Sequence, residues 1–413
     1  MINIVDKKLC CACSACVQKC PKHSITMYED DEGFSYPLVN QDTCINCNLC
    51  EKVCPMLHQA EKIEPQKVLA AKNTCVEERM NSSSGGVFLL LAKEVIKQGG
   101  VVFGAVYDEK WEVHHIYATK IEDVYPMMGS KYVQSRIENS YREAEKFLKQ
   151  GQKVMFVGSP CQIAGFRAFL RNKEYDNLLA IDFVCHGVPS PGVWRRYLAE
   201  TYSNSEMMVQ YRRQAAGKNS VLLSSLNAKS PIGDIKFRDK TEDGWKKFRF
   251  VVRKKSVSKK DRNTVLSSDI HYMNVYMKGF LNNIYLRPSC YSCKCKNGVS
   301  NSDLTLADFW GINTINPSFD DDKGCSLVLI NSGRGNAIFE SLKLETWKSD
   351  LKIAKQFNPG FGDMIPDNPF RKRFFRMFNR GMTVEKSIQK CYSLSFMERC
   401  KLKVKRILKQ IMK

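Results

Sequence analysis

The chain has 413 residues, of which 43% are hydrophobic and 26% charged, a composition typical of a soluble globular protein with room for two or three domains. Its longest apolar run, residues 87–92, is too short to cross a bilayer, and no signal-peptide core precedes the first cysteine. We therefore expect a cytoplasmic protein, whose 18 cysteines are reduced and serve mainly as metal ligands.

The formal net charge of +21 is concentrated in two segments. Residues 211–263 carry 16 Lys/Arg against 5 Asp/Glu, and residues 366–413 carry 14 against 3, so the rest of the chain is close to neutral. This distribution argues against a fold built around nucleic acid and indicates two local basic surfaces.

The N-terminal cysteines form two matched units. Cys10-x2-Cys13-x2-Cys16-x3-Cys20-Pro21 recurs 34 residues later as Cys44-x2-Cys47-x2-Cys50-x3-Cys54-Pro55. This is the bacterial ferredoxin spacing, in which the fourth cysteine of each unit reaches the [4Fe–4S] cluster of the other. Zinc sites would not need two crossed units, and the reducing compartment disfavours disulfides.

The spacing therefore predicts a ferredoxin-like module over residues 1–60 with two clusters. One takes Cys10, Cys13, Cys16 and Cys54, and the other takes Cys44, Cys47, Cys50 and Cys20. Cys11 is left as a spare residue of the first loop. Residues 24–44 predict two short strands with a turn at Gly33.

A serine-rich helix start follows the module. Ser82–Ser84 predict the cap of a helix over 86–97, and a strand follows at 101–107. Serines and paired glycines at a helix start expose backbone N–H groups, as phosphate sites do, although capping alone also explains them.

Two strand–loop–helix units come next. The strand at 153–157 leads through a Gly-Ser-Pro-Cys turn into a helix, and the strand at 178–184 leads through Cys185 and His186 into a helix that begins at Pro191. Such alternation predicts a parallel sheet with a site at the strand ends, and it places Cys161 and Cys185 in corresponding loops.

The remaining segments differ in character. Residues 205–265 predict a basic β-hairpin at Asp243–Gly244, interpreted as a surface insertion, and further strands and a helix follow over 266–365. The tail, 366–413, predicts a basic amphipathic helix that either lies on an anionic membrane surface or packs on its own domain. Its apolar face comprises Met397, Val404, Ile407, Leu408, Ile411 and Met412.

Several motifs together resemble those of the beta subunits of coenzyme F-420 hydrogenases and dehydrogenases, which form one family. The motifs are SSSGGVF, KYVQS, FVGSPCQIAGF, DFVCHGVPSP, RPSCYSC, LADFWG and SLVLIN, spread over roughly residues 75–335. The resemblance implies an iron–sulfur flavoprotein that passes electrons between clusters, FAD and an organic substrate. The subgroup that looks most similar comes from bacterial polysaccharide gene clusters, so a role in polysaccharide biosynthesis is a further expectation.

The resemblance also implies site residues in the body of the chain. Those for FAD are Ser83, Ser84, Gly85, Gly86, Lys131, Tyr132, Gln134 and Ser135, with Lys131 also as the catalytic residue that stabilises the reduced flavin. Those for a third [4Fe–4S] cluster are Cys161, Cys185, Cys290 and Cys293, with Cys295 competing for the last place. The alternatives are a solvated surface lysine and buried, apolar cysteines.

Other candidates are given structural roles. We expect His186 to brace its loop through a hydrogen bond. Cys75, Cys325, Cys391 and Cys400 have no partner pattern and are predicted to be structural.

The expected fold is α+β, a bacterial ferredoxin-like module followed by a mixed α/β flavin-binding domain made from residues 61–204 and 266–365. The first hypothesis is an FAD- and iron–sulfur-dependent oxidoreductase, supplied by a redox partner protein or a small-molecule donor. The alternative is an electron-transfer subunit with its chemistry on a partner chain, and a third reading is a cluster protein without flavin. Contact with the inner membrane face through the tail is a separate hypothesis.

Overall fold

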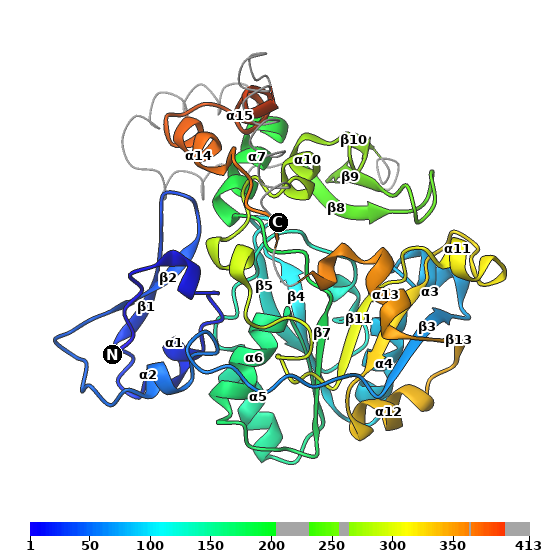
Figure 1. Ribbon diagram of the computed structural model, residues 1–413, viewed down its shortest axis with the longest axis horizontal. Coiled ribbons are helices and arrows are strands. Elements are labelled where there is room, and N and C mark those ends of the chain that lie inside the picture. Colours follow the sequence, from blue (N-terminus) through cyan, green and yellow to red (C-terminus); the bar gives the residue numbers. More distant parts are fainter. Residues whose placement is uncertain (204–230, 256–263, 363–364, 393–413) are drawn as a thin grey trace, which may run out of the picture.

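The computed structural model describes residues 1–203, 231–255, 264–362 and 365–392 (Figure 1). The N-terminal module packs beside a larger mixed α/β body, on the side that carries α5 and α6. The helices of the described residues are α1 (Ala15–Lys19), α2 (Leu49–Lys52), α3 (Val76–Met80), α4 (Val87–Lys97), α5 (Ser140–Lys149), α6 (Pro160–Phe169), α7 (Pro191–Tyr202), α10 (Val275–Leu281), α11 (Ile312–Ile315), α12 (Gly333–Glu340), α13 (Leu351–Phe357), α14 (Arg371–Asn379) and α15 (Val384–Tyr392).

The module is a small two-stranded unit with two short helices. Its strands β1 (Ile25–Glu29) and β2 (Ser35–Val39) pair antiparallel, and Gly33 takes a φ of 77° in the turn between them. This agrees with the prediction, because glycine reaches that left-handed conformation without steric cost.

The centre of the body is a mixed sheet in the order β13-β3-β12-β11-β7-β6-β4-β5. Its strands are β3 (Lys67–Asn73), β4 (Val101–Tyr107), β5 (Val113–Ala118), β6 (Val154–Val157), β7 (Leu178–Phe183), β11 (Leu304–Asp308), β12 (Ser326–Ile330) and β13 (Leu344–Ser349). The neighbours β4–β6, β6–β7 and β7–β11 are parallel, which confirms the predicted parallel core, and antiparallel pairs flank it.

Alternate residues of the central strands face opposite layers. Val101 and Phe103 pack into a core with residues of α5 and α6, whereas Val102, between them, packs into a core with residues of α4 and α12. This is the two-residue period of a strand buried on both faces. Because β6 and β7 are parallel, the segments after them, which carry Cys161 and Cys185, leave the same edge of the sheet. Cys161 lies in the first turn of α6, not in the loop that the sequence predicts for it.

A second sheet contains β8 (Ile232–Asp239), β9 (Arg249–Lys254) and β10 (Val265–Ile270). Asp243 and Gly244 lie between β8 and β9, as predicted, but the sheet is not a surface appendage. Phe237 and Phe250 are at most 1% exposed and pack with Trp194 of α7. Pairing of β10 with β9 means that the expected boundary at residue 265 falls inside this sheet.

The first part of the tail also packs on the body. Phe374, Phe375 and Phe378 of α14 are buried in the same core as α7 and α10, and Arg196 of α7 donates to the Phe378 carbonyl at 2.6 Å. The amphipathic helix predicted around 397–412 lies outside the described residues. No helix in the described part of the chain is long and apolar enough to span a membrane.

Polar contacts fasten the module to the body. Gln18 accepts from the Tyr141 backbone N–H at 3.0 Å through its Oε1, and its carbonyl accepts from Arg142 Nε at 2.6 Å. At the other end, a Cβ on Gly33 would lie 2.4 Å from the Gly192 Cα, so the two backbones touch. The module is therefore held from two sides, along α5 and at the start of α7.

Candidate functional site: three cysteine groups and an adjoining serine turn

The cysteines of the module line two separate hollows. The first is lined by Cys10, Cys13, Cys16 and Cys54, together with Cys11. The second is lined by Cys20, Cys44, Cys47 and Cys50. Each hollow thus holds three cysteines of one unit and the last cysteine of the other, which is the grouping that the spacing predicts. We call them the inner and the outer cysteine group.

The two loops repeat each other in backbone conformation as well as in sequence. Ala12 and Ser14 have φ values of 54° and 61°, and Asn46 and Asn48, at the equivalent positions, have 52° and 57°. Left-handed residues turn the chain tightly, so that cysteines three positions apart face one hollow. The alanine is the more strained of these residues, since asparagine accepts this conformation readily.

Backbone N–H groups point at two of these sulfurs. The N–H of Ile2 donates to Cys50 Sγ and that of Ser24 to Cys20 Sγ, both at 3.3 Å. Hydrogen bonds to the ligand sulfurs are among the contacts by which a protein tunes an iron–sulfur cluster. Within the described residues, no group of three or more His, Cys, Asp or Glu side chains could hold a single metal ion. A [4Fe–4S] cluster is larger than a single ion and binds one thiolate at each of its four iron atoms. The cysteines that surround each hollow are arranged for such a cluster.

The body contributes a third cysteine group, formed by Cys161, Cys185, Cys290 and Cys293. Cys161 lies in the first turn of α6, Cys185 follows β7, Cys290 lies within the short turn of Pro288–Ser292, and Cys293 directly follows that turn. Every pair within the group is close enough for the two thiols to interact electrostatically. The structure therefore brings together the four residues predicted for a third cluster.

The environment of this third cysteine group favours neutral thiols unless a cation binds. Burial raises the pKa of Cys185, and burial also raises the pKa of Cys290 to about 12. For Cys161, a hydrogen bond with Cys11 is the main cause of a raised pKa, followed by burial. Thiolates at these positions thus need iron or another cation to stabilise them.

Two further cysteines lie between the inner and third groups. Cys11, predicted to be a spare residue, is 6% exposed and is hydrogen-bonded to both Cys13 and Cys161. Cys295 is 1% exposed and interacts electrostatically with Cys54, Cys161 and Cys293. The sequence offered no signal for this placement, because it depends on how the module docks on the body.

The serine turn, residues 82–86, is braced from several sides. Ser83 Oγ accepts from the Ser130 N–H at 2.7 Å, and Ser84 Oγ donates to the Cys325 carbonyl at 2.8 Å. A Cβ on Gly85 would lie 2.2 Å from the Ala71 carbonyl oxygen, and Gly86 has a φ of 85°. These contacts give the motif a structural role of its own. The predicted serine cap of this helix is wrong: Gly86 is the N-cap of α4, and no described side chain caps it, so its first N–H groups remain suited to an anion.

Lys131 lies in a largely apolar environment. Its Nζ donates to the carbonyls of Met127, Met128 and Gly129 at 3.1–3.3 Å, and no described carboxylate pairs with it. Burial lowers the pKa of Lys131 to about 7. A lysine of this kind can change charge near neutral pH, unlike a solvated surface lysine.

Replacing Lys131 with methionine is expected to flatten the dependence of stability on pH. Because the folded pKa is lowered to about 7 from 10.5, the unfolded chain binds the additional proton between these values. The free energy of unfolding should then rise with pH through this window, by at most about 1.4 kcal/mol per unit. Urea unfolding at several pH values measures the slope. Lys97→Met, at an exposed lysine of α4, is the control, and an unchanged slope in Lys131→Met would contradict the assignment.

The other candidates near Lys131 connect the serine turn with the cysteines. Tyr132 stacks on Phe280, with ring centroids 4.7 Å apart. Gln134 Nε2 donates to the Cys11 carbonyl at 3.0 Å, and Ser135 Oγ accepts from Gln162 Nε2 of α6 at 2.9 Å. Segment 130–135 therefore starts at Ser130, which is hydrogen-bonded to Ser83, and ends beside Cys11 and the start of α6.

Sequence reasoning did not predict the burial of two basic residues, Arg238 in β8 and Lys240 directly after it. Lys240 is 2% exposed, donates to the Ser84 carbonyl at 3.2 Å, and has its pKa lowered to about 7 by burial. Arg238 is buried and forms a bidentate ion pair with Asp308 of β11. The basic composition of 205–265 is visible in the sequence, but interpreting it as a surface insertion misses the approach of Lys240 to the serine turn and the burial of Arg238 against β11.

The remaining candidates have local surroundings. His186 Nε2 forms a hydrogen bond with Asn283 Oδ1 at 2.6 Å, as expected of a loop-bracing residue. Cys75 is exposed, whereas Cys325 and Cys391 are buried; Cys400 lies outside the described residues.

Comparisons with known proteins find distant relatives. The F subunit of the F(420)H(2) dehydrogenase of Methanosarcina mazei is 26% identical over 203 residues, which are 44% of this chain and 55% of the relative. The coenzyme F420-dependent sulfite reductase of Methanocaldococcus jannaschii is 28% identical over 168 residues, 40% of this chain and 26% of the relative. The matches therefore span less than two thirds of both curated relatives.

A solved structure, of the F420-reducing [NiFe] hydrogenase complex from Methanosarcina barkeri, matches with a TM-score of 0.41 and 17% identity, over 72% of this chain and 89% of that one. Two family models also match. Residues 9–57 match the 4Fe–4S dicluster domain, and residues 151–348 match the C terminus of the coenzyme F420 hydrogenase/dehydrogenase beta subunit. The chain thus carries a segment that matches the C terminus of coenzyme F420 hydrogenase/dehydrogenase beta subunits, and a 4Fe–4S dicluster domain near its N-terminal end.

Proposed function

We propose that the protein is an iron–sulfur flavoprotein oxidoreductase, which passes electrons between three [4Fe–4S] clusters, FAD and an organic substrate. The observation that carries this proposal is the arrangement of its cysteines. The outer, inner and third groups form a continuous row from the module into the body, and we call it the cysteine row.

Successive groups in the cysteine row lie close enough for their thiols to interact electrostatically. Cys50 of the outer group interacts electrostatically with Cys16 and Cys54 of the inner group. Cys11 then joins the inner and third groups through Cys13 and Cys161. The outer group includes Cys47, which is exposed, whereas Cys290 and Cys293 of the third group are less accessible. Electrons would enter or leave the protein at the exposed end, and the cysteine row would connect that end with the sheet.

The flavin would lie beyond the third group, along segment 130–135. This segment joins the serine turn at Ser130 to Cys11 at Gln134, so a ligand lying along it reaches both a phosphate-type site and the clusters. The N-terminal N–H groups of α4 would hold the pyrophosphate, with Lys240 close by to offset its charge.

This chain's own groups would set the properties of the bound cofactors. The clusters supply single-electron transfer, and FAD combines these electrons in pairs. Lys131, positioned by three carbonyls, would place a positive charge or a proton beside the flavin ring, as its lowered pKa permits. Tyr132 and Phe280 offer a flat aromatic surface on the same segment.

The alternative function is an electron-transfer subunit without flavin, and the exposed end of the cysteine row favours it. Cys47 and its neighbours open to the surface, where a partner protein can dock. A relative named as a dehydrogenase subunit supports a protein redox partner for this chain too.

Cofactor analysis separates these proposals. Full-length protein purified without oxygen should contain about twelve iron and about twelve sulfide atoms per chain, with about one FAD released on denaturation. A content of about eight iron atoms per chain would show that the third cluster is absent. Three clusters without releasable flavin would reject the first function and leave the electron-transfer subunit.

The substrate is a separate proposal. Because both curated relatives are named for coenzyme F420, the reduced form of this coenzyme is the first electron donor to test, with a viologen dye as acceptor. A cytoplasmic location, a role in polysaccharide biosynthesis and membrane contact through residues 393–413 stay predictions. Pelleting of the intact and tail-deleted protein with anionic liposomes tests the membrane contact.

A further inference from the structure

Cys11 is the residue at which the inner and third cysteine groups meet. It lines the inner hollow but is not one of the four predicted ligands there, and it is 6% exposed. Its side chain is hydrogen-bonded to Cys13, a predicted ligand of the inner cluster, and to Cys161, a predicted ligand of the third. One thiol therefore contacts the ligand sulfurs of two different clusters.

The approach of α6 to the first cysteine loop makes these contacts possible. Cys161 and Gly165 lie about one turn apart in α6, so they share a face of the helix. A Cβ on Gly165 would lie 2.7 Å from the Cys13 sulfur, which means that this face rests directly on the loop. Gln134 Nε2 also donates to the Cys11 carbonyl at 3.0 Å. The position of Cys11 beside Cys161 is thus held by the packing of α6 and by a side-chain hydrogen bond.

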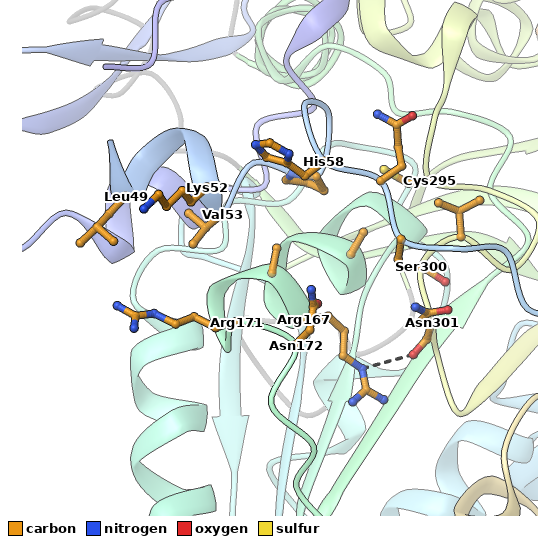
Figure 2. A pocket seen from close by; sticks show the side chains of 16 residues that line it. Leu49, Lys52, Val53, His58, Arg167, Arg171, Asn172, Cys295, Ser300 and Asn301 are labelled. Carbon is orange, nitrogen blue, oxygen red and sulfur yellow. Dashed lines mark hydrogen bonds between the residues drawn. The ribbon is translucent and has the colours of Figure 1, made fainter. Parts of the chain in front are cut away.

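Cys295, the other cysteine between these groups, has a different environment. It lines a cavity of about 410 Å³ at the interface between module and body, together with residues of α6 (Figure 2). Cys11 and Cys161 are not among the described residues that line this cavity. Water in the cavity therefore does not compete for the hydrogen bonds of Cys11, and such bonds are stronger where water is excluded.

We propose that Cys11 is a shared hydrogen-bond donor, which binds the ligand sulfur of whichever of the inner and third clusters is reduced. This inference rests on the proposed function, which places a cluster in each group. Cys11 has one S–H hydrogen, whereas Cys13 and Cys161 would be iron-bound thiolates that can only accept. A thiolate at Cys11 would add a negative charge between two anionic sites, so Cys11 keeps its hydrogen.

One hydrogen shared between two acceptors would couple the two clusters. When one electron leaves the inner cluster and enters the third, the negative charge on Cys13 decreases and that on Cys161 increases. Cys11 would then turn its S–H from Cys13 to Cys161 and keep its proton, so the step consumes no other reactant. Because a hydrogen bond to a ligand sulfur stabilises the more negative, reduced form, Cys11 would favour reduction of one cluster at a time.

Redox titration of the full-length protein, purified without oxygen and followed by electron paramagnetic resonance, tests this inference. Cys11→Ala should keep about twelve iron atoms per chain, because Cys11 is not a ligand. Of the inner and third clusters, the one that is reduced first should become harder to reduce, by about tenfold in the equilibrium constant, or about 59 mV for one electron. Cys11→Ser, which retains a donor, should restore most of this difference.

Cys391→Ala, at a fully buried cysteine of α15 outside all three groups, is the matched control and should leave both potentials unchanged. Unchanged potentials in Cys11→Ala would overturn the inference and leave the proposed function intact. Equal shifts in Cys11→Ala and Cys11→Ser would also overturn it, since they would indicate an effect of packing.

The iron content separates the remaining outcomes. Loss of about four iron atoms in Cys11→Ala would overturn the inference, because Cys11 would then be a ligand. A wild-type protein with about eight iron atoms per chain would reject the third cluster and this inference together.

Discussion

Replacing Cys54 with serine should remove about four iron and four sulfide atoms per chain and leave the other clusters in place. Cys54 lies in the inner group, although it belongs to the second sequence unit. Serine is nearly isosteric but a poor ligand for a soft iron–sulfur cluster. Iron and sulfide analysis of protein purified without oxygen measures the loss, and electron paramagnetic resonance of the reduced protein identifies the missing cluster.

Cys20→Ser is the reciprocal experiment. Cys20 belongs to the first sequence unit but lines the outer hollow, so its replacement should remove the outer cluster instead. Cys75→Ser, at an exposed cysteine outside all three groups, should keep the full iron content. If Cys20→Ser lost the same spectral signal as Cys13→Ser, a cysteine of its own sequence unit, the crossed assignment of ligands would be wrong.

Replacing Arg287 with methionine should lower the free energy of unfolding by about 3–6 kcal/mol, because three buried acceptors lose their donor. Arg287 is fully buried and donates to the Cys10 carbonyl at 2.7 Å, to Gln134 Oε1 at 3.1 Å and to the Ser35 carbonyl at 3.0 Å. It therefore connects the body with both the first cysteine loop and β2. Urea unfolding followed by circular dichroism gives the change in free energy.

The same variant should also disturb the inner cluster, since Cys10 loses the support of its carbonyl. We expect a broadened or diminished cluster signal at an otherwise native secondary structure. The control is Lys67→Met, which breaks an exposed ion pair with Glu340 and should have little effect on stability. A similar small effect of Arg287→Met would show that the module does not depend on this contact.

Local sequence patterns predicted the parts of the fold that depend on near neighbours. The doubled cysteine spacing anticipated which residues share each hollow, because the reach of a tight loop is short. The predicted helix at 86–97 and strand at 101–107 appear as α4 and β4, since the helical period and its glycine stop are local signals. Parallel strand order brought Cys161 and Cys185 to one edge of the sheet.

Contacts between distant segments were less accessible to such reasoning. Residues 205–265 were interpreted as an insertion because they are basic, yet Phe237 and Phe250 fill the core beside Trp194. The period of a strand tells which residues share a face but not which layer that face covers. For the same reason, the sequence does not predict that Lys240 donates to the Ser84 carbonyl in the serine turn.

The sequence by itself determined the two ferredoxin-type units with their eight candidate ligands, and the alternation of strands and helices, because each depends on spacing along the chain. Only the tertiary structure decided that the module docks with Cys11 against Cys161, and that Cys290 and Cys293 lie beside Cys161 and Cys185. Docking depends on complementary surfaces, with Arg287 and Gln18 as buried connections, and no repeat or period in the sequence records which surfaces meet.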